Sequence, residues 1–188
     1  TSNGKSAVFR LEDHIKRLFN TWHIAGFKIP FTFDEICAAC KETLAINGLK
    51  EGYIRPLVFL GEGSLGVFPS ENPVRVAIAV WEWGKYLGPE ALEKGIRAKI
   101  SSFTRYHPNT AMTRGKFTGN YITGVLAKVE AKKLGFDEAI LLDPDGFVSE
   151  GTGENIFLVK NGVVKTTPLT NILPGVTRET VITLLDEM

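Results

Sequence analysis

The stretch FVSEGTGENIFLV, residues 147–159, decides how the second half of this chain folds. Both of its ends are apolar and rich in strand-forming residues, so they predict buried β-structure. Its middle holds two carboxylates, Glu150 and Glu154, between glycines. A simple hairpin needs only the two polar residues of a tight turn. The longer polar interruption therefore indicates that these carboxylates have a task beyond forming a turn.

The patterns around this stretch predict a mixture of helices and strands. Directly after it, Asn161-Gly162 is a strong hairpin signal. Before it, a helix is expected over 121–134, because Gly135 follows Lys132 and Lys133 as at a typical helix end. The other elements expected in this half are strands over 96–103 and 139–142, a loop over 106–115, a turn over 144–146 and a final helix from about 177.

The first half of the chain begins with two expected helices. Apolar residues at helical spacing predict one over 11–23. A second is expected over 33–47, with Thr32 as its N-cap. Cys37 and Cys40 fall on the apolar face of this second helix, which favours two buried thiols in a reducing cytoplasm. The alternative of a CxxC redox or metal motif is weak, because one pair is only half of a Cys₄ zinc site; no metal is expected.

Two strands are expected to follow these helices. Residues 53–60 are a predicted strand in which Pro56 favours a sheet edge or a bulge, since proline has no N–H to donate. Residues 74–81 are almost continuously apolar, which favours a central strand.

The segment after these strands changes in texture. Residues 82–90 are aromatic and glycine-rich without a helical or strand period, as in a connection between two parts. We therefore predict an α+β fold with a small lobe over 1–82, an interdomain loop over 83–90 and a larger lobe over 91–188. Both ends read as cuts, because the chain has no starting Met and stops within an expected helix.

The composition excludes several classes of protein. The chain of 188 residues is 44% hydrophobic and 23% charged, with a formal net charge of +1. There is no basic surplus of the kind that nucleic-acid or membrane binding requires, so neither partner is expected. No run approaches the length of a spanning helix, and the start lacks an apolar signal region.

Two polar side chains are candidates for chemistry. Lys116 lies between glycines just before a predicted helix. Such a lysine is more often solvated surface, but lysine is also the side chain that forms Schiff bases with aldehydes. Glu150 is more often an exposed carboxylate, but it could instead face a nitrogen heterocycle. In pyridoxal phosphate (PLP) chemistry, an acid at the pyridine nitrogen keeps the ring protonated and electron-withdrawing.

A third candidate feature is LPGVTRET, residues 173–180. Val176 and Thr177 stand at a helix start, where backbone amides and the helix dipole suit a phosphate. Thr177 could instead only cap the helix. Arg17 could supply a guanidinium to the same phosphate, although taken alone it is more often a surface residue. Together these features supply what a PLP site requires.

The motifs that carry these residues resemble those of the class IV, or fold type IV, PLP aminotransferases. The chain is most similar to the branched-chain amino acid aminotransferases, and the similarity covers essentially its whole length. The matching stretches, in family order, are VFRLEDHIKRL (8–18), YIRPLVFLG (53–61), WGKYLG (83–88), GKFTGNY (115–121), SEGTGENIF (149–157) and LPGVTRE (173–179). Family members carry an N-terminal strand segment and a C-terminal part that this sequence does not include.

The resemblance implies a role for individual residues around the cofactor. Lys116 is similar to the catalytic Schiff-base lysine, Tyr121 to the donor to the ring oxygen O3′, and Glu150 to the partner of the pyridine nitrogen. The implied phosphate ligands are Arg17, Val176 and Thr177. Glu154 and Asn155 are expected only to orient the site.

The resemblance also implies a substrate pocket, a reaction and an oligomer. Arg55 is similar to the residue that receives the distal carboxylate of glutamate. The implied pocket walls are Trp83 and Tyr86, with Leu65 and Val67 reaching the pocket of a neighbouring subunit. The implied enzyme is a cytoplasmic homodimer or higher homo-oligomer that transfers the amino group of leucine, isoleucine or valine to 2-oxoglutarate in branched-chain amino acid biosynthesis.

Three alternatives remain open at this point. A D-amino acid or amine transaminase, or an aminodeoxychorismate lyase, would use the same fold with a different substrate. A non-catalytic binding or assembly module would keep the fold without needing Lys116. A redox protein would depend on Cys37 and Cys40.

Overall fold

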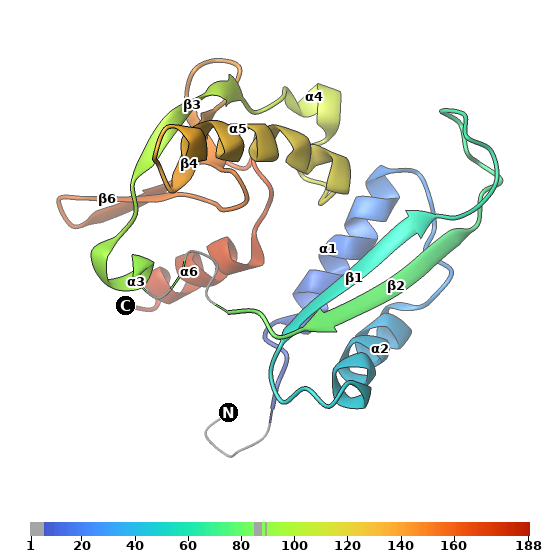
Figure 1. The fold of residues 1–188 in the computed structure, drawn as a ribbon. Helices are drawn as coiled ribbons and strands as arrows, with labels where there is room; N and C mark the ends of the chain where they lie inside the picture. Colours follow the sequence, from blue (N-terminus) through green and yellow to red (C-terminus); the bar gives the residue numbers. More distant parts are fainter. Residues whose placement is uncertain (1–5, 85–87, 89) are drawn as a thin grey trace. The chain divides into compact units, whose positions relative to one another are not determined.

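A computed structural model describes residues 6–84, 88 and 90–188 as helices and short β-sheets, in agreement with the predicted α+β class (Figure 1). The chain divides into two units, residues 1–86 and 87–188. The boundaries at 82/83 and 90/91 stay a prediction.

The first unit consists of two helices on a β-hairpin. Its elements are α1 (Leu11–Ile24), α2 (Phe33–Ile46), β1 (Tyr53–Leu60) and β2 (Val74–Trp81). The strands pair antiparallel in unbroken register from Tyr53 opposite Trp81 to Leu60 opposite Val74. Both helices lie on one side of the hairpin (Figure 1). The predicted elements of this half are therefore confirmed to within a residue.

The core of the first unit forms where the helices meet the strands. Its buried residues are Leu11, Ile15, Ile36, Cys37 and Cys40, and side chains of both strands pack against them. The expected burial of both cysteines is thus confirmed, and both are free thiols. Burial raises the pKa of Cys40 to about 11. Because thiol–disulfide exchange needs an accessible thiolate, this environment opposes a redox function.

The start of α2 follows the predicted cap. The hydroxyl Oγ1 of Thr32 accepts a hydrogen bond from the Glu35 amide at 3.2 Å, and the Glu35 carboxylate accepts one from the Thr32 amide at 2.7 Å. Each side chain thereby satisfies a backbone donor that the helix start leaves without a partner.

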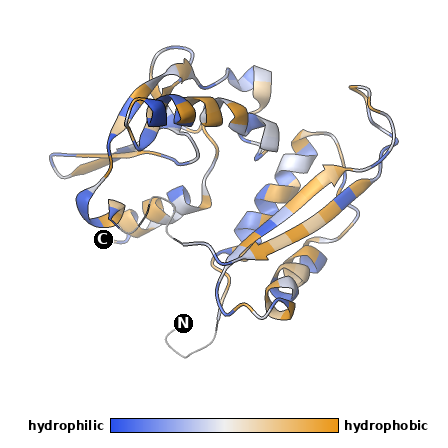
Figure 2. Cartoon of the chain, viewed as in Figure 1, coloured by the Kyte–Doolittle hydropathy of each residue, from blue (hydrophilic) through white to orange (hydrophobic). Residues whose placement is uncertain are grey.

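The expectation of a central strand over 74–81 is wrong for the described part of the chain. There β2 pairs with β1 in a two-stranded sheet, and its residues alternate between partly buried and exposed. Figure 2 shows that most of both strands is hydrophobic. The outward positions include Ala77 and Ala79, whose small methyl groups made a one-sided strand look apolar on both faces. In this sheet Pro56 lies on an edge strand without a bulge, as predicted.

The second unit is built around a three-stranded sheet in the order β3-β4-β5. β3 (Ala98–Thr104) runs parallel to β4 (Glu138–Leu142), which runs antiparallel to β5 (Val148–Gly151). Helix α5 (Ile122–Lys133) forms the crossover between the parallel strands and packs on both of them. Small residues make this close contact possible, since Ala127, Ala131 and Ala139 are fully buried with Leu141.

The remaining elements of the second unit surround this sheet. They are α3 (Ala91–Lys94), α4 (Pro108–Ala111), the 3₁₀ turn η1 (Thr118–Tyr121), β6 (Phe157–Lys160), β7 (Val163–Thr166) and α6 (Val176–Asp186). The predicted hairpin is confirmed, with Asn161 and Gly162 at φ of 53° and 74°, as a tight turn requires. The loop expected over 106–115 instead contains the single turn α4, which begins with proline at its first position.

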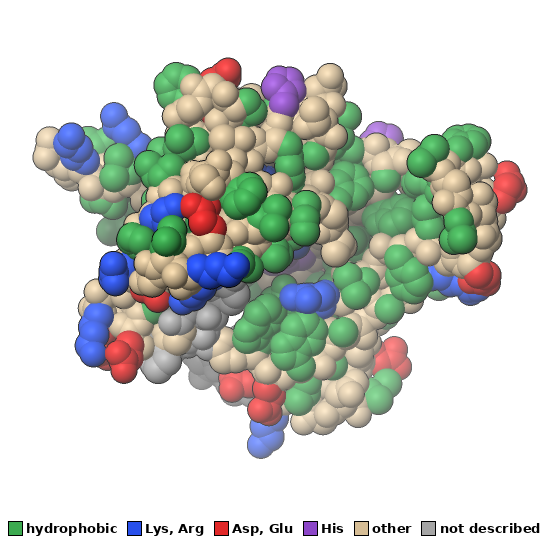
Figure 3. Space-filling model, turned by 45° about the horizontal axis from the view of Figure 1, so that its top comes forward, with side chains coloured by type: hydrophobic (Ala, Val, Ile, Leu, Met, Phe, Trp, Pro, Cys, Tyr) green, Lys and Arg blue, Asp and Glu red, His purple; other side chains and the backbone are tan. Residues whose placement is uncertain are grey.

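The surface of both units mixes charged and apolar side chains. On α5 the side chains of Ile122, Val125 and Val129 are each about half exposed. Figure 3 shows hydrophobic side chains gathered between charged ones on the face that it displays. None of the helices in the described ranges is long and apolar enough to cross a bilayer.

A glycine in α5 permits the closest approach between that helix and the turn after β5. A Cβ at Gly124 would lie 2.4 Å from the Thr152 carbonyl oxygen, which is too close for any real contact. We therefore expect Gly124→Ala to lower the free energy of unfolding by about 2 kcal/mol, as overpacking does. Urea denaturation of the cofactor-free protein measures this change.

The matched control is Gly119→Ala, because a Cβ at Gly119 has nothing within 4 Å. Equal free energies of unfolding for the two variants would show that the Gly124 contact is not tight in solution.

Candidate functional site

Lys116 and Tyr121 are brought together at the entrance to α5. Lys116 precedes η1, its side chain is exposed, and Tyr121 ends that turn. The Lys116 Nζ donates a hydrogen bond to the Tyr121 hydroxyl at 2.5 Å. Residues five positions apart need not be close in space, so the 3₁₀ turn η1 is what brings these two side chains together.

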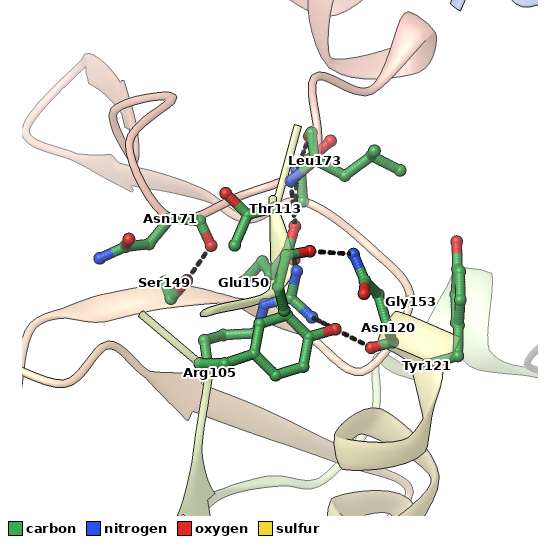
Figure 4. Close-up of polar contacts among 12 residues, drawn as sticks. Arg105, Thr113, Asn120, Tyr121, Ser149, Glu150, Gly153, Asn171 and Leu173 are labelled. Atoms are coloured by element: carbon green, nitrogen blue, oxygen red, sulfur yellow. Dashed lines mark hydrogen bonds and ion pairs between the residues drawn. The ribbon is translucent and has the colours of Figure 1, made fainter. Parts of the chain in front are cut away.

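Glu150 lies on β5 and is buried, with 6% of its surface exposed. Its Oε1 forms an ion pair with the Arg105 Nη2 at 2.7 Å. Its Oε2 accepts hydrogen bonds from the Asn155 Nδ2 at 3.1 Å and from the Leu173 amide at 3.3 Å. Figure 4 shows Glu150 between Arg105 and Leu173, which come from different parts of the unit. The carboxylate is therefore not an exposed loop residue.

Arg105 is the site residue that the sequence analysis missed. It directly follows β3, and its amide donates to the Leu142 carbonyl at the end of β4 at 2.8 Å. On the other side of β4, Glu150 lies opposite Leu141. The ion pair thus spans the middle strand of the sheet. A single arginine at the start of an apparent loop carries no sequence signal of this pairing, because it depends on the strand order.

Asn155 connects Glu150 to the segment before α6. Besides its bond to Glu150, its Nδ2 donates to the Leu173 carbonyl at 3.0 Å. Helix α6 then begins with Gly175 as its N-cap, Val176 buried and Thr177 exposed. Since Gly175 holds the cap position, Thr177 is not the N-cap, and that alternative is wrong.

Burial dominates the electrostatics of Glu150. It raises the pKa of the carboxyl to about 7, although the charges of Arg105 and Lys116 and the Leu173 amide act to lower it. The carboxyl therefore titrates near neutral pH in the cofactor-free protein. A pKa shifted into this range is frequent at catalytic sites.

Comparison with known proteins identifies the family. The family model for class IV aminotransferases matches residues 1–188. The chain belongs to this family. It is 48% identical to the branched-chain-amino-acid aminotransferase of Pseudomonas aeruginosa, over 97% of the chain and 59% of that protein. With the enzyme of the same name from Escherichia coli K12 it shares 44% identity, over 96% of the chain and 59% of the relative.

Solved structures agree with this assignment. The crystal structure of the Escherichia coli branched-chain amino acid aminotransferase matches 95% of the chain and 60% of its own, with a TM-score of 0.93 and 44% identity. The enzyme from Thermoproteus uzoniensis with norvaline matches with a TM-score of 0.92 at 41% identity, over 98% of the chain and 62% of its own. The chain thus spans about 60% of the length of these class IV aminotransferases.

The remaining predicted site residues of this class IV chain lie in the first unit. Arg17 is half-buried on α1, with its Nη2 3.5 Å from the His14 Nδ1. Leu65 and Val67 are fully exposed in the connection between β1 and β2. Trp83 follows β2 and is 44% exposed. Tyr86 lies outside the described residues.

Arg55 on β1 is held by three aromatic rings. Its guanidinium carbon lies 4.9 Å from the ring centroid of Trp81, 5.3 Å from that of Tyr53 and 5.6 Å from that of Trp83. The two tryptophan rings stack at 5.4 Å. Cation–π contacts attract a guanidinium without neutralising its charge, so these rings leave Arg55 able to pair with an anion.

The Glu150 pKa predicts how stability depends on pH. The unfolded chain releases this proton near the ordinary glutamate pKa of 4.5, and the folded protein releases it near pH 7, so between these values the folded state binds more protons. The contribution of Glu150 to the free energy of unfolding of the cofactor-free protein should therefore fall as pH rises through this window, by at most about 3.4 kcal/mol, and level off above it.

The pH profile of Glu150→Gln, whose side chain stays neutral, should lack this contribution, and the profile of Glu71→Gln, which changes an exposed glutamate, should keep it. Urea denaturation between pH 4.5 and 8 measures both. A wild type and a Glu150→Gln variant with parallel pH profiles would contradict the assignment of the slope to Glu150.

Proposed function

We propose that the protein carrying this chain is a PLP-dependent branched-chain-amino-acid aminotransferase, EC 2.6.1.42. It transfers the amino group of leucine, isoleucine or valine to 2-oxoglutarate and yields the branched 2-oxo acid and glutamate. The observation that carries the proposal is the pairing of Lys116 with Tyr121 in the same unit as the buried Glu150–Arg105 ion pair. The branched-chain enzymes at 44% and 48% identity support the choice of substrate.

The hydrogen bonding of Glu150 fits a protonated ring nitrogen. A carboxylate has about four acceptor positions. In the described part of the chain, Asn155 and the Leu173 amide occupy Oε2, and Arg105 occupies Oε1 once. One acceptor position on Oε1 is left for a donor, and a pyridinium N–H is such a donor. Arg105 supports this use, because its charge favours the ionised carboxylate that a pyridinium requires.

Individual residues would each hold one part of the cofactor. Lys116 would bind its aldehyde carbon, Tyr121 its ring oxygen O3′ and Glu150 its ring nitrogen. The amides at the start of α6 and the Thr177 hydroxyl would bind its phosphate, since helix N-termini favour anions. Val176, which is buried at this start, contributes its backbone. Arg17 would add a guanidinium to the phosphate.

The chain's own residues then perform the proton transfers. When bound, PLP supplies an aldehyde that accepts the amino group and a ring that withdraws electrons from the substrate α-carbon. The Lys116 amine takes the proton from the α-carbon of the amino acid and returns one when the 2-oxo acid accepts the amino group. The Tyr121 hydroxyl, 2.5 Å from the Lys116 Nζ, orients that amine. Glu150 keeps the proton on the ring nitrogen.

One pocket has to accept both an aliphatic and an acidic side chain. Trp83 and Tyr86 would cover the aliphatic one, and burial of its apolar surface contributes about 25 cal/mol per Å². A buried carboxylate without a charged partner would be costly. Arg55, held in its aromatic surroundings, would provide that partner for 2-oxoglutarate and glutamate.

The protein is further proposed to be a cytoplasmic homodimer or higher homo-oligomer. Leu65 and Val67 are exposed to 103% and 106%, and Phe68 beside them to 81%. Covering such exposed apolar side chains with another copy of the chain would stabilise the assembly, which supports their role in a neighbouring subunit's pocket. The two buried free thiols are typical of a reducing compartment.

Lys116→Ala tests the proposed role of Lys116 in transamination against the alternative of a non-catalytic module. The wild type, incubated with PLP and reduced with borohydride, should carry the label on the peptide that contains Lys116. The variant should lose both the label and transamination, with a rate lower by at least about 10²- to 10⁴-fold, since the amine also moves the proton. Mass spectrometry of the peptides measures the label.

Lys133→Ala removes an exposed lysine at the end of α5 and should leave labelling and rate unchanged. Labelling of the wild type scattered over surface lysines would contradict the proposed site.

Arg55→Ala tests the substrate assignment against a D-amino acid or amine transaminase and against a lyase. Loss of a charged partner should cost about 2 kcal/mol for the acidic substrate, which is roughly a 30-fold decrease in kcat/KM for 2-oxoglutarate. The kcat/KM for leucine should change by less than about threefold, because its side chain carries no charge. Steady-state kinetics with each substrate varied separately measures the difference.

Arg75→Ala is the matched control, because Arg75 is an exposed arginine on the same hairpin that pairs with Glu62. An equal loss for leucine and 2-oxoglutarate in Arg55→Ala would mean that Arg55 does not select the acidic substrate.

A further inference from the structure

Glu154, the second carboxylate between the glycines after β5, has no task in the proposed reaction. Its Oε2 accepts a hydrogen bond from the Gly153 amide at 2.9 Å. Its Oε1 is buried, and no N–H or O–H of the described residues reaches it. The Glu138 carboxyl acts on the Glu154 carboxyl both through its charge and through side-chain hydrogen bonding. Two carboxylates can only accept, so a hydrogen bond between them requires a proton on one of the two.

The donors around Glu138 decide which of the two carries this proton. Glu138 begins β4 and is 6% exposed. The Lys128 Nζ on α5 donates to its Oε2. The Thr152 hydroxyl and the Ala139 amide donate to its Oε1 at 2.7 and 2.8 Å. Three donors, one of them the Lys128 ammonium, suit an ionised acceptor, whereas the O–H of a protonated Glu138 would face one of these donors. The proton therefore belongs to Glu154.

The titration of the two groups agrees with this geometry. Burial raises the pKa of Glu154, and the negative charge of Glu138 raises it further against the opposing effects of the Gly153 amide and Lys128. Burial alone would also raise the pKa of Glu138, but hydrogen bonds from Lys128, the Ala139 amide and Thr152 outweigh it and lower the pKa.

Glu154 is linked to Glu150 through the turn between them. The Gly151 amide donates to the Glu154 carbonyl at 2.7 Å and closes the turn. A Cβ at Gly151 would lie 2.7 Å from the Glu154 Oε2, so the acid is packed against the backbone that carries Glu150. The next residue, Asn155, donates to the Glu150 carboxylate. A shift of Glu154 would therefore move both the backbone and one hydrogen-bond donor of Glu150.

We propose that Glu154 is a neutral acid that donates a hydrogen bond to Glu138 and, as a positioning residue, holds the turn over 151–154 so that Glu150 faces the ring nitrogen of the cofactor. This role rests on the proposed function, because it concerns how Glu150 meets PLP. Glu138, Thr152 and Lys128 form the ionised side of the pair, and they anchor the turn to β4 and α5.

The proposal predicts an asymmetry between two conservative substitutions. Glu154→Gln keeps an N–H donor for Glu138 and an acceptor for the Gly153 amide. Glu138→Gln places an amide N–H₂ against the donors of Lys128, Thr152 or Ala139. Glu154→Leu keeps the volume of the side chain but removes the donor. Glu130→Leu is the control, because Glu130 also pairs with a lysine and hydroxyls, but those of Lys99, Ser101 and Ser102 on β3.

The readouts are the affinity for PLP and the visible absorption spectrum of the bound cofactor as a function of pH. Glu154→Leu should weaken PLP binding by about tenfold or more and shift the pH dependence of the spectrum, because Glu150 no longer holds the ring nitrogen in place. Glu154→Gln should stay within about threefold of the wild type with an unchanged spectrum. Glu138→Gln should resemble Glu154→Leu, and Glu130→Leu should resemble the wild type.

Each other outcome overturns a defined part of the proposal. If Glu154→Leu binds PLP with wild-type affinity and spectrum, Glu154 has no positioning role. If Glu138→Gln is tolerated and Glu154→Gln is not, the proton lies on Glu138. If Glu154→Leu lowers the free energy of unfolding in urea but leaves the cofactor spectrum intact, its role is structural only. Failure of the wild type to label at Lys116 would overturn the proposed function, and the positioning role with it.

Discussion

The ion pair between Arg105 and Glu150 is the interaction on which the candidate site depends. Both side chains are more than nine-tenths buried and meet at 2.7 Å. Taking two charges out of water costs more than their attraction returns unless other hydrogen bonds complete them. Asn155 and the Leu173 amide each add a hydrogen bond to the second carboxylate oxygen. The site therefore exists only when the end of β3, the strand β5 and the segment before α6 are all in place.

The order of the strands explains why these groups meet. β4 lies between β3 and β5. The Arg105 backbone bonds to the end of β4 on its β3 side, and Glu150 pairs with β4 on its β5 side. The crossover helix α5 packs on this sheet through alanines and through Gly124, which admits the Thr152 carbonyl. The same helix supplies Lys128 to Glu138. The packing of α5 on the sheet therefore also places the Lys128 ammonium beside the Glu138 carboxylate.

Local patterns predicted most of the elements because local forces form them. The Thr32 cap, the Asn161-Gly162 turn and the helical spacing over 11–23 each act within a few residues, and each appears in the structure as expected. The prediction that β2 is a central strand was wrong, because an alanine in the sequence does not show whether the strand face that carries it is buried or exposed. The turn α4 was missed because one turn of helix has too few residues to show a period.

The sequence by itself determined the family, through motifs whose order and spacing carry the class IV signature, and it singled out Lys116, Tyr121 and Glu150. Side chains that come from nearby residues, such as Lys116 and Tyr121, needed only the short turn η1 to meet. Only the tertiary structure decided that Arg105 is the partner of Glu150 and that Glu138 faces Glu154. These pairs join residues separated by many positions along the chain, and strand order and burial, which no local pattern encodes, determine both their proximity and their protonation.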